Sequence, residues 1–233
     1  MARPTTFGAD PIDLFDPTPY TALSYYAHIA IGIIALAAMV TAFAATKGGR
    51  LHVRAGQAFL LTILVVAASA TAMLTVAYVP PLMLAVATVL YAGGTAWLAL
   101  RPRRAWTVPA ELVLAAMQVA ALAAFLARAV PAVNAGTLPG VAVIVLSAVP
   151  LLMLAGDLRY FRAGAERARL RISRHLSRMV WTSMVAIRAP LVELAAGGLP
   201  IPQPLLLFGP VFAGLLAIWY FSRKRRLPVR FVV

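Results

Sequence analysis

Seven long apolar runs, separated by charged residues, prolines or glycines, constrain this sequence more than any other feature. A helix needs about 20 apolar residues to cross the hydrocarbon core of a bilayer. The runs span approximately residues 25–46, 56–79, 82–100, 107–127, 141–155, 176–196 and 205–221. The sequence therefore predicts an all-α, polytopic membrane helix bundle with seven transmembrane helices in one domain, residues 25–222. We expect residues 1–24 to form an irregular outer segment and residues 223–233 a basic cytoplasmic tail.

The composition excludes several other classes. Hydrophobic residues make up 62% of the chain and charged residues 12%, whereas a soluble domain has about 45–50% apolar and about 25% charged residues. A soluble enzyme and a disordered chain are therefore excluded. The chain contains no cysteine, which excludes a disulfide scaffold, a thiolate metal site and an iron–sulfur cluster.

The basic residues predict how the chain is oriented. With seven spans, 18 of the 21 lysines and arginines fall in loops and in the tail on one face. An excess of lysine and arginine marks the cytoplasmic side, so we expect the N-terminus outside and the C-terminus inside a bacterial inner membrane. The net charge of +14 then reflects topology and contact with anionic lipid at the cytoplasmic face, and it does not indicate a nucleic-acid partner.

Three histidines are the candidate cofactor ligands. His28 and His52 each precede a glycine by four residues, Gly32 and Gly56, on one helix face. Each glycine leaves space for a planar cofactor or a second helix backbone, or else serves only helix packing. His52 and His175 lie at the cytoplasmic ends of spans two and six, where two imidazoles can ligate haem b or a transition metal. The alternative is that both bond headgroups or loop carbonyls. His28 lies in the outer half of span one, too far away to join that site.

Span six carries two charges within the membrane, Arg188 and Glu193. Ionised groups at this depth are costly and are candidates for function. We expect them to line an outward-facing polar pocket beside His28. The alternative is that both side chains extend to the outer headgroups.

Two further carboxylates, Glu111 and Asp157, lie at the cytoplasmic ends of spans four and five. We expect them to form ion pairs with the arginine-rich loop that follows span five, and a proton relay is the alternative. Four arginines around the start of span six have a helical spacing that predicts one stripe lying on anionic lipid. They are Arg167, Arg171, Arg174 and Arg178.

Three short motifs resemble one family. They are the His28-x-x-x-Gly32 span, the Lys-Gly-Gly-Arg-Leu-His-x-x-x-Gly segment at residues 47–56, and Arg-His-Leu-Ser-Arg-Met at residues 174–179. Together they resemble the bacterial predicted membrane proteins grouped as domain of unknown function 2306. The resemblance implies that His28, His52 and His175 are signature positions, and it implies no reaction. The alanine-rich helices and the long arginine-rich fifth loop depart from the pattern of that group.

The sequence leaves three functions open for this membrane protein. The first is haem or metal ligation by His52 and His175, with a redox, electron-transport or cofactor-handling role. The second is a non-catalytic accessory or assembly subunit of a membrane complex. The third is a small-solute or proton-coupled transporter that uses His28, Arg188 and Glu193. The sequence does not decide whether the protein is an enzyme.

Overall fold

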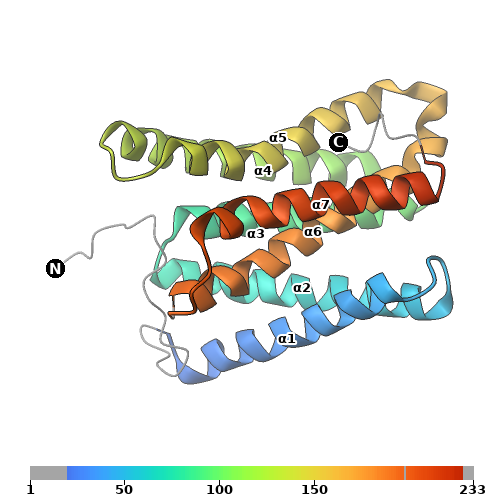
Figure 1. Ribbon diagram of the computed structural model, residues 1–233. Coiled ribbons are helices and arrows are strands. Elements are labelled where there is room, and N and C mark those ends of the chain that lie inside the picture. The colour runs from blue at the N-terminus through green and yellow to red at the C-terminus, as the bar shows by residue number, and fades with distance from the viewer. Residues whose placement is uncertain (1–19, 197, 228–233) are drawn as a thin grey trace. The chain divides into compact units, whose positions relative to one another are not determined.

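A computed structural model describes residues 20–196 and 198–227 (Figure 1). In these residues the chain forms seven α-helices and one short 3-10 helix, and no strand. The α-helices are α1 (Ala22–Ala44), α2 (Arg50–Val76), α3 (Pro80–Leu100), α4 (Thr107–Asn134), α5 (Gly140–Arg162), α6 (Arg167–Ala196) and α7 (Gln203–Lys224). The all-α class is thereby confirmed for the described part of the chain.

Six of these helices are long and apolar enough to cross a membrane, which fits a multi-pass membrane protein. The exception is α6, which forms a 30-residue helix over the predicted sixth span but carries several charges. The count of seven spans and the orientation of the chain remain predictions. Most of the predicted N-terminal segment, residues 1–19, and the last six residues of the predicted tail lie outside the described residues.

Two helices continue beyond the predicted ends of their spans: α5, which ends at Arg162 and not near residue 155, and α4. The fourth span was expected to end before Pro131, but α4 continues to Asn134. A proline within a helix removes only one backbone hydrogen bond. Beyond it, the amides of Ala135 and Thr137 donate to the carbonyls of Pro131 and Ala132 at 2.9 Å, so the last turn is completed.

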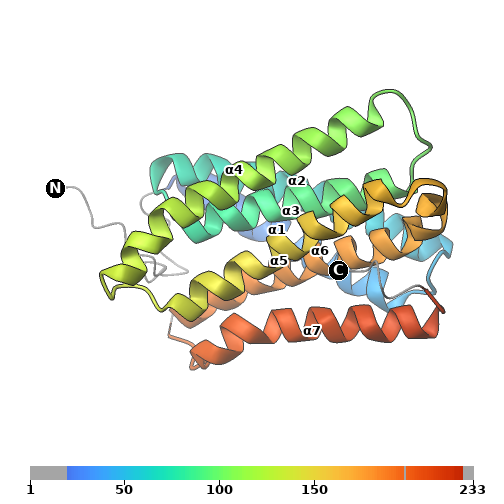
Figure 2. The same ribbon diagram turned by 90° about the horizontal axis from the view of Figure 1, so that it is seen from above.

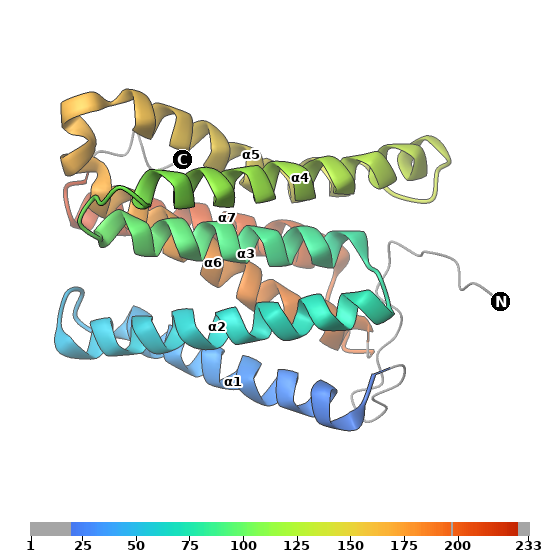
Figure 3. The same cartoon turned by 180° about the vertical axis from the view of Figure 1, so that it is seen from behind.

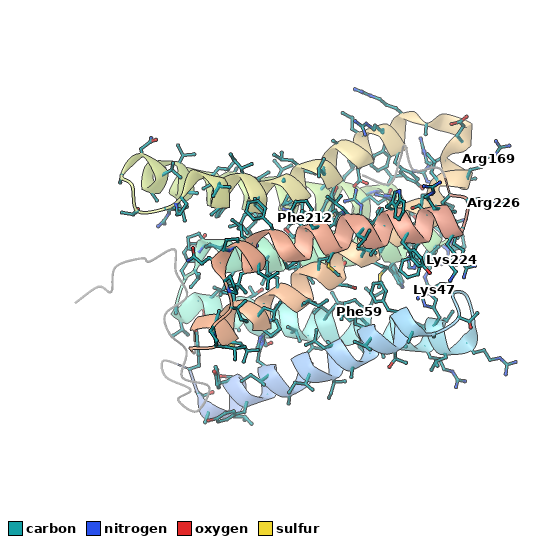
Figure 4. The ribbon with its side chains drawn as sticks, in the orientation of Figure 1. Lys47, Phe59, Arg169, Phe212, Lys224 and Arg226 are labelled. Atoms are coloured by element: carbon teal, nitrogen blue, oxygen red, sulfur yellow. The ribbon has the colours of Figure 1, made fainter. Side chains whose placement is uncertain are left out.

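The chain divides into two compact units, and the first comprises residues 1–86 and 189–200. Its main element is the hairpin of α1 and α2, which pack along each other (Figure 1). Lys47 in the connecting turn donates to the carbonyls of Ala42 and Phe43 at 2.9 and 2.6 Å, and so caps the end of α1. Phe59 of α2 is almost fully buried, and Figure 4 marks its position together with that of Lys47.

The second unit comprises residues 87–188 and 201–233 and holds most of α3, all of α4 and α5, most of α6, and α7. Within it, α5 contacts both α4 and α7, as Figure 2 shows from above. Small residues allow close packing here. A Cβ on Gly94 of α3 would lie 2.7 Å from Leu114 of α4, and one on Gly214 of α7 would lie 2.8 Å from the Trp181 ring of α6.

One end of the second unit gathers helix termini and basic residues, and we call it the basic end. Here α3, α5 and α7 end and α4 and α6 begin, as Figure 3 shows from behind. Figure 4 shows Arg169, Lys224 and Arg226 at this end.

The second unit is apolar outside and partly polar inside. Its exposed faces present large apolar side chains, such as Val113, Ile144 and Phe212 at 66–70% exposure. Its interior holds threonines, serines, a glutamine, two carboxylates and two arginines. An apolar surface with polar groups turned inward is the arrangement expected of helices in lipid.

Candidate functional site

Five buried side chains from four helices of the second unit form one connected group, which we call the buried charge cluster. Each member is at most 5% exposed. The members are Tyr91 of α3, Glu111 of α4, Asp157 of α5, and Arg174 and Arg178 of α6.

Asp157 is the centre of the buried charge cluster. Its Oδ1 accepts hydrogen bonds from Arg174 Nε at 3.0 Å and Arg178 Nη2 at 2.6 Å. Its Oδ2 accepts a hydrogen bond from the Tyr91 hydroxyl at 2.5 Å. Arg174 Nη1 donates to Glu111 Oε1, so Arg174 bridges the two carboxylates. Arg174 Nη2 lies 2.9 Å from Asp157 Oδ1 but lacks hydrogen-bond geometry.

Aromatic rings and a backbone carbonyl complete the surroundings of the two guanidinium groups. The Arg174 guanidinium lies 4.3 Å from the centre of the Tyr160 ring, and that of Arg178 lies 5.0 Å from the centre of the Tyr91 ring. Arg178 Nη2 also donates to the Met153 carbonyl at 2.5 Å. Planar guanidinium groups suit both ring stacking and carboxylate binding, which a lysine ammonium would do less well.

The buried charge cluster is electrically neutral, because two carboxylates face two guanidinium groups. The negative charges of Asp157 and Glu111 offset the cost of burying the Arg174 guanidinium. The arginine therefore stays charged. Pairing within the protein is what makes such charges tolerable away from water.

A pocket of about 370 Å³ opens beside the cluster at the basic end, and we call it the arginine pocket. Its wall includes four arginines, namely Arg101, Arg103, Arg167 and Arg171. Thr107, Glu111 and Tyr160 also line it. Since Glu111 is already paired with Arg174, the positive charge of the four arginines is not balanced by that carboxylate.

Two helices begin at the arginine pocket. Thr107 is the first residue of α4 and Arg167 the first residue of α6, and both line the pocket. The amides of Thr107 and Arg167 already donate to the carbonyls of Arg104 and Gly164, so these helix starts contribute through the partial positive charge of the helix dipole. Two helix N-termini therefore add to the arginine charge, a combination that favours an anion.

Two of the four pocket arginines, Arg167 and Arg171, are held in place by backbone carbonyls. Arg171 donates to the carbonyls of Ala99 at 2.7 Å and Arg101 at 3.1 Å, which ties the start of α6 to the end of α3. Arg167 donates to the carbonyl of Phe161 at 2.6 Å, and its Nε is buried with no hydrogen-bond partner among the described residues. These bonds fix the two guanidinium groups before any ligand arrives.

The prediction that four arginines form a stripe on lipid is wrong for Arg174 and Arg178, which face the protein interior, and stays a prediction for Arg167 and Arg171. Arg174 and Arg178 are 3% exposed and belong to the buried charge cluster, while Arg167 and Arg171 bind backbone carbonyls. The helical spacing was predicted correctly. The partner of the two buried arginines was not, because a stripe of one charge indicates a shared face but not what covers it.

The three histidines each engage a protein oxygen through Nδ1. His52 lies 3.0 Å from the Ala42 carbonyl in the first unit, and His175 lies 3.1 Å from the Ala96 carbonyl in the second. His28 lies 2.7 Å from the Ser69 hydroxyl, whose own proton goes to the Val66 carbonyl at 2.9 Å. The carbonyls that face His52 and His175 can only accept, so Nδ1 of each of these two rings carries a proton.

Haem or metal ligation by His52 and His175 remains a prediction, because the two residues belong to different units. The Nδ1-protonated tautomer is the one that a metal-binding histidine adopts when its other nitrogen bonds a carbonyl. Among the described residues, no group of three or more histidine, aspartate or glutamate side chains is arranged to hold a metal. Among the described residues, a Cβ on Gly32 or Gly56 would meet nothing within 4 Å, so no second backbone in that part of the chain lies against either glycine.

Arg188 and Glu193 are partly buried, and Arg188 Nε and Glu193 Oε2 have no hydrogen-bond partner among the described residues. They belong to different units. The polar pocket predicted beside His28 therefore remains a prediction.

Part of the buried charge cluster could be predicted from the sequence. The expected ion pairing of Glu111 and Asp157 with nearby arginines is confirmed, although the pairs are buried rather than interfacial. Tyr91 and the arginine pocket were not predicted. No local pattern distinguishes Tyr91 from a packing residue, and the pocket depends on which helix ends meet.

No family model, curated protein or solved structure matches this chain. The resemblance to the domain of unknown function 2306 group therefore remains a prediction that rests on the three short motifs.

Proposed function

We propose that this protein is a multi-pass inner-membrane protein that binds a phosphate-bearing anion in the arginine pocket at its cytoplasmic face. The observation that carries the proposal is the pocket itself, where four arginines and the starts of α4 and α6 meet. The proposal favours a solute-handling role over the haem and accessory roles that the sequence left open.

Phosphate is the group that suits this lining best. A guanidinium presents parallel N–H donors that match two phosphate oxygens, and helix N-termini attract phosphate through their partial positive charge. A singly charged carboxylate would leave most of the arginine charge unbalanced. The volume of about 370 Å³ exceeds that of a phosphate ion and leaves room for a further polar group of the ligand.

Two kinds of ligand carry such a phosphate: a soluble phosphate ester and the headgroup of an anionic lipid. Both offer the same chemistry to the pocket. They differ in how they reach it, since a lipid headgroup enters from the bilayer and a soluble ester from the aqueous phase.

The test compares Arg103→Gln with Arg104→Gln in protein reconstituted in neutral-lipid nanodiscs. Arg103 lines the pocket and Arg104 does not, although both are exposed and adjacent in the chain. Calorimetric titration with glycerol phosphate tests the soluble source, and nanodiscs containing phosphatidylglycerol test the lipid source. We expect Arg103→Gln to weaken phosphate binding about tenfold, a loss of about 1.4 kcal/mol, and Arg104→Gln to change it less than twofold.

Equal binding by the two variants would show that the pocket is not the site. If glycerol phosphate binds but phosphatidylglycerol does not compete, the ligand is soluble. If only phosphatidylglycerol stabilises the protein against thermal unfolding, the ligand is lipid.

A further inference from the structure

Gln118 of α4 is the most unusual buried polar residue of the second unit. It is 0% exposed, and neither its amide nitrogen nor its amide oxygen has a hydrogen-bond partner among the described residues. A buried amide without partners is costly, and more so where the surroundings are lipid. A side chain of this kind therefore points to an occupant that supplies the missing bonds.

Gln118 lies on the same face of α4 as the arginine pocket. It follows Glu111 by seven residues, which is close to two full helical turns. Thr107, Glu111 and Gln118 are all buried, and Thr107 and Glu111 line the pocket. Between Glu111 and Gln118 this face carries the apolar residues Leu114 and Ala115, so Gln118 is an isolated polar group inside the unit.

Arg178 of α6 lies at a matching depth. Both α4 and α6 begin at the arginine pocket, and Gln118 and Arg178 each come 11 residues after the first residue of their helix. At 1.5 Å per residue, each is about 16 Å along its helix from the pocket. Nearer to the pocket the two helices are joined by an ion pair between Arg174, one turn before Arg178, and Glu111, two turns before Gln118.

Arg178 also has an unused donor. Its Nη2 serves Asp157 and the Met153 carbonyl, but its Nη1 is buried without a hydrogen-bond partner among the described residues. A free guanidinium N–H and a free amide N–H are the donors that an oxyanion needs. Beyond Gln118, the same face of α4 continues with Leu122, Phe125 and Ala129, which are buried and apolar.

We infer that Gln118 and Arg178 form a second, inner subsite, which receives the oxyanion from the arginine pocket on a transfer path through the second unit. This inference rests on the proposed function, because the pocket supplies the ligand. On α6 the buried residues between the basic end and Arg178 are mostly polar, and beyond Gln118 the buried face of α4 is apolar. Binding sites near the middle of the membrane are typical of transporters.

The test measures exchange of labelled inorganic phosphate across proteoliposomes, and phosphate binding to the same preparations. The variants are Gln118→Leu, which removes the amide at similar size, and Gln118→Asn, which keeps an amide. Val119→Leu is the control, because Val119 is the next residue of α4 and is 52% exposed on the outer face. Replacement of an unpartnered amide by an apolar group does not threaten the fold, and thermal unfolding of each variant checks this.

We expect wild-type and Val119→Leu protein to exchange phosphate at equal rates. Gln118→Leu is expected to lower exchange at least tenfold while phosphate binding stays within twofold of wild type. Gln118→Asn is expected to restore at least a third of the wild-type rate, which a purely packing role would not require.

The inference fails if Gln118→Leu exchanges phosphate as fast as wild type, or if wild-type protein binds phosphate and does not exchange it. Both outcomes leave the arginine pocket intact as a binding site. If wild-type protein binds no phosphate, the proposed function fails as well, and the binding measurement identifies that case.

Discussion

Asp157→Asn is the substitution that tests the structure most directly. The Asp157 carboxylate accepts hydrogen bonds from Arg174, Arg178 and Tyr91. Asparagine keeps the shape but removes the negative charge, and it places an amide donor against other donors. Two buried guanidinium groups then share the single carboxylate of Glu111.

The expected cost follows from this loss of charge. Removing one partner of a buried ion pair costs about 3–5 kcal/mol, because the remaining charge is left uncompensated. Weakening the charge-assisted bond from Tyr91 contributes in the same direction. We therefore expect Asp157→Asn to lower the free energy of unfolding by about 3–5 kcal/mol.

The assay is reversible unfolding in mixed detergent micelles, followed by circular dichroism. Glu166→Gln is the matched control, since Glu166 is an exposed acid near the start of α6, and we expect a change within about 0.5 kcal/mol. The double variant Asp157→Asn, Arg178→Met restores neutrality. We expect its loss of unfolding free energy to be smaller, by about 1–3 kcal/mol, than the summed losses of the two single variants, as is usual for residues in one network.

Two results would refute this account. A loss below about 1 kcal/mol for Asp157→Asn would place the cost in the range of an ordinary neutral hydrogen bond and not of a buried ion pair. Additive effects in the double variant would mean that Asp157 and Arg178 do not act as a pair.

Three further predictions concern packing, orientation and the cofactor. Gly214→Val should destabilise the protein by about 1–3 kcal/mol through overpacking, whereas Gly32→Val, where a Cβ meets nothing within 4 Å, should be far milder; unfolding in micelles measures both. Because the chain has no cysteine, Lys47→Cys and Lys224→Cys can each be labelled with a membrane-impermeant thiol reagent in whole and in broken cells. The predicted orientation requires both to react only in broken cells, and labelling of either in whole cells would contradict it. Finally, haem ligation predicts an absorption spectrum with a Soret band and with an α-band that sharpens on reduction. The His52→Ala substitution should abolish both bands. A flat spectrum of protein from haem-sufficient cells would contradict that prediction.

The helices could be predicted from the sequence because their signal is local. Runs of about 20 apolar residues end at charges, prolines and glycines, and each predicted span overlaps one helix of the structure. The error at Pro131 has the same origin: proline is a strong local signal, but near the end of a helix it removes one bond without ending the helix.

The site could be predicted only in part because its geometry is not local. Glu111 and Asp157 lie at the ends of predicted spans, where a carboxylate needs a cationic partner, so their ion pairing could be predicted from the sequence. That both converge on Arg174, and that Tyr91 joins them from α3, depends on which helices are neighbours. The arginine pocket likewise exists only because the end of α3 and the starts of α4 and α6 meet at the basic end.

The buried charge cluster also explains why α6 differs from the other helices. The mean hydropathy of α6 counts every arginine as if it faced lipid. By that measure the helix is too polar to cross a membrane. Arg174 and Arg178 do not face lipid, because Asp157 and Glu111 neutralise them inside the second unit. The residues that follow Arg178, from 179 to 187, carry no charge at all. Arg174 and Arg178, neutralised by neighbouring helices, thus meet the condition under which charged residues are accepted in a membrane. A crossing by α6 would bring the basic tail to the same side as the basic loops, as the distribution of lysine and arginine requires.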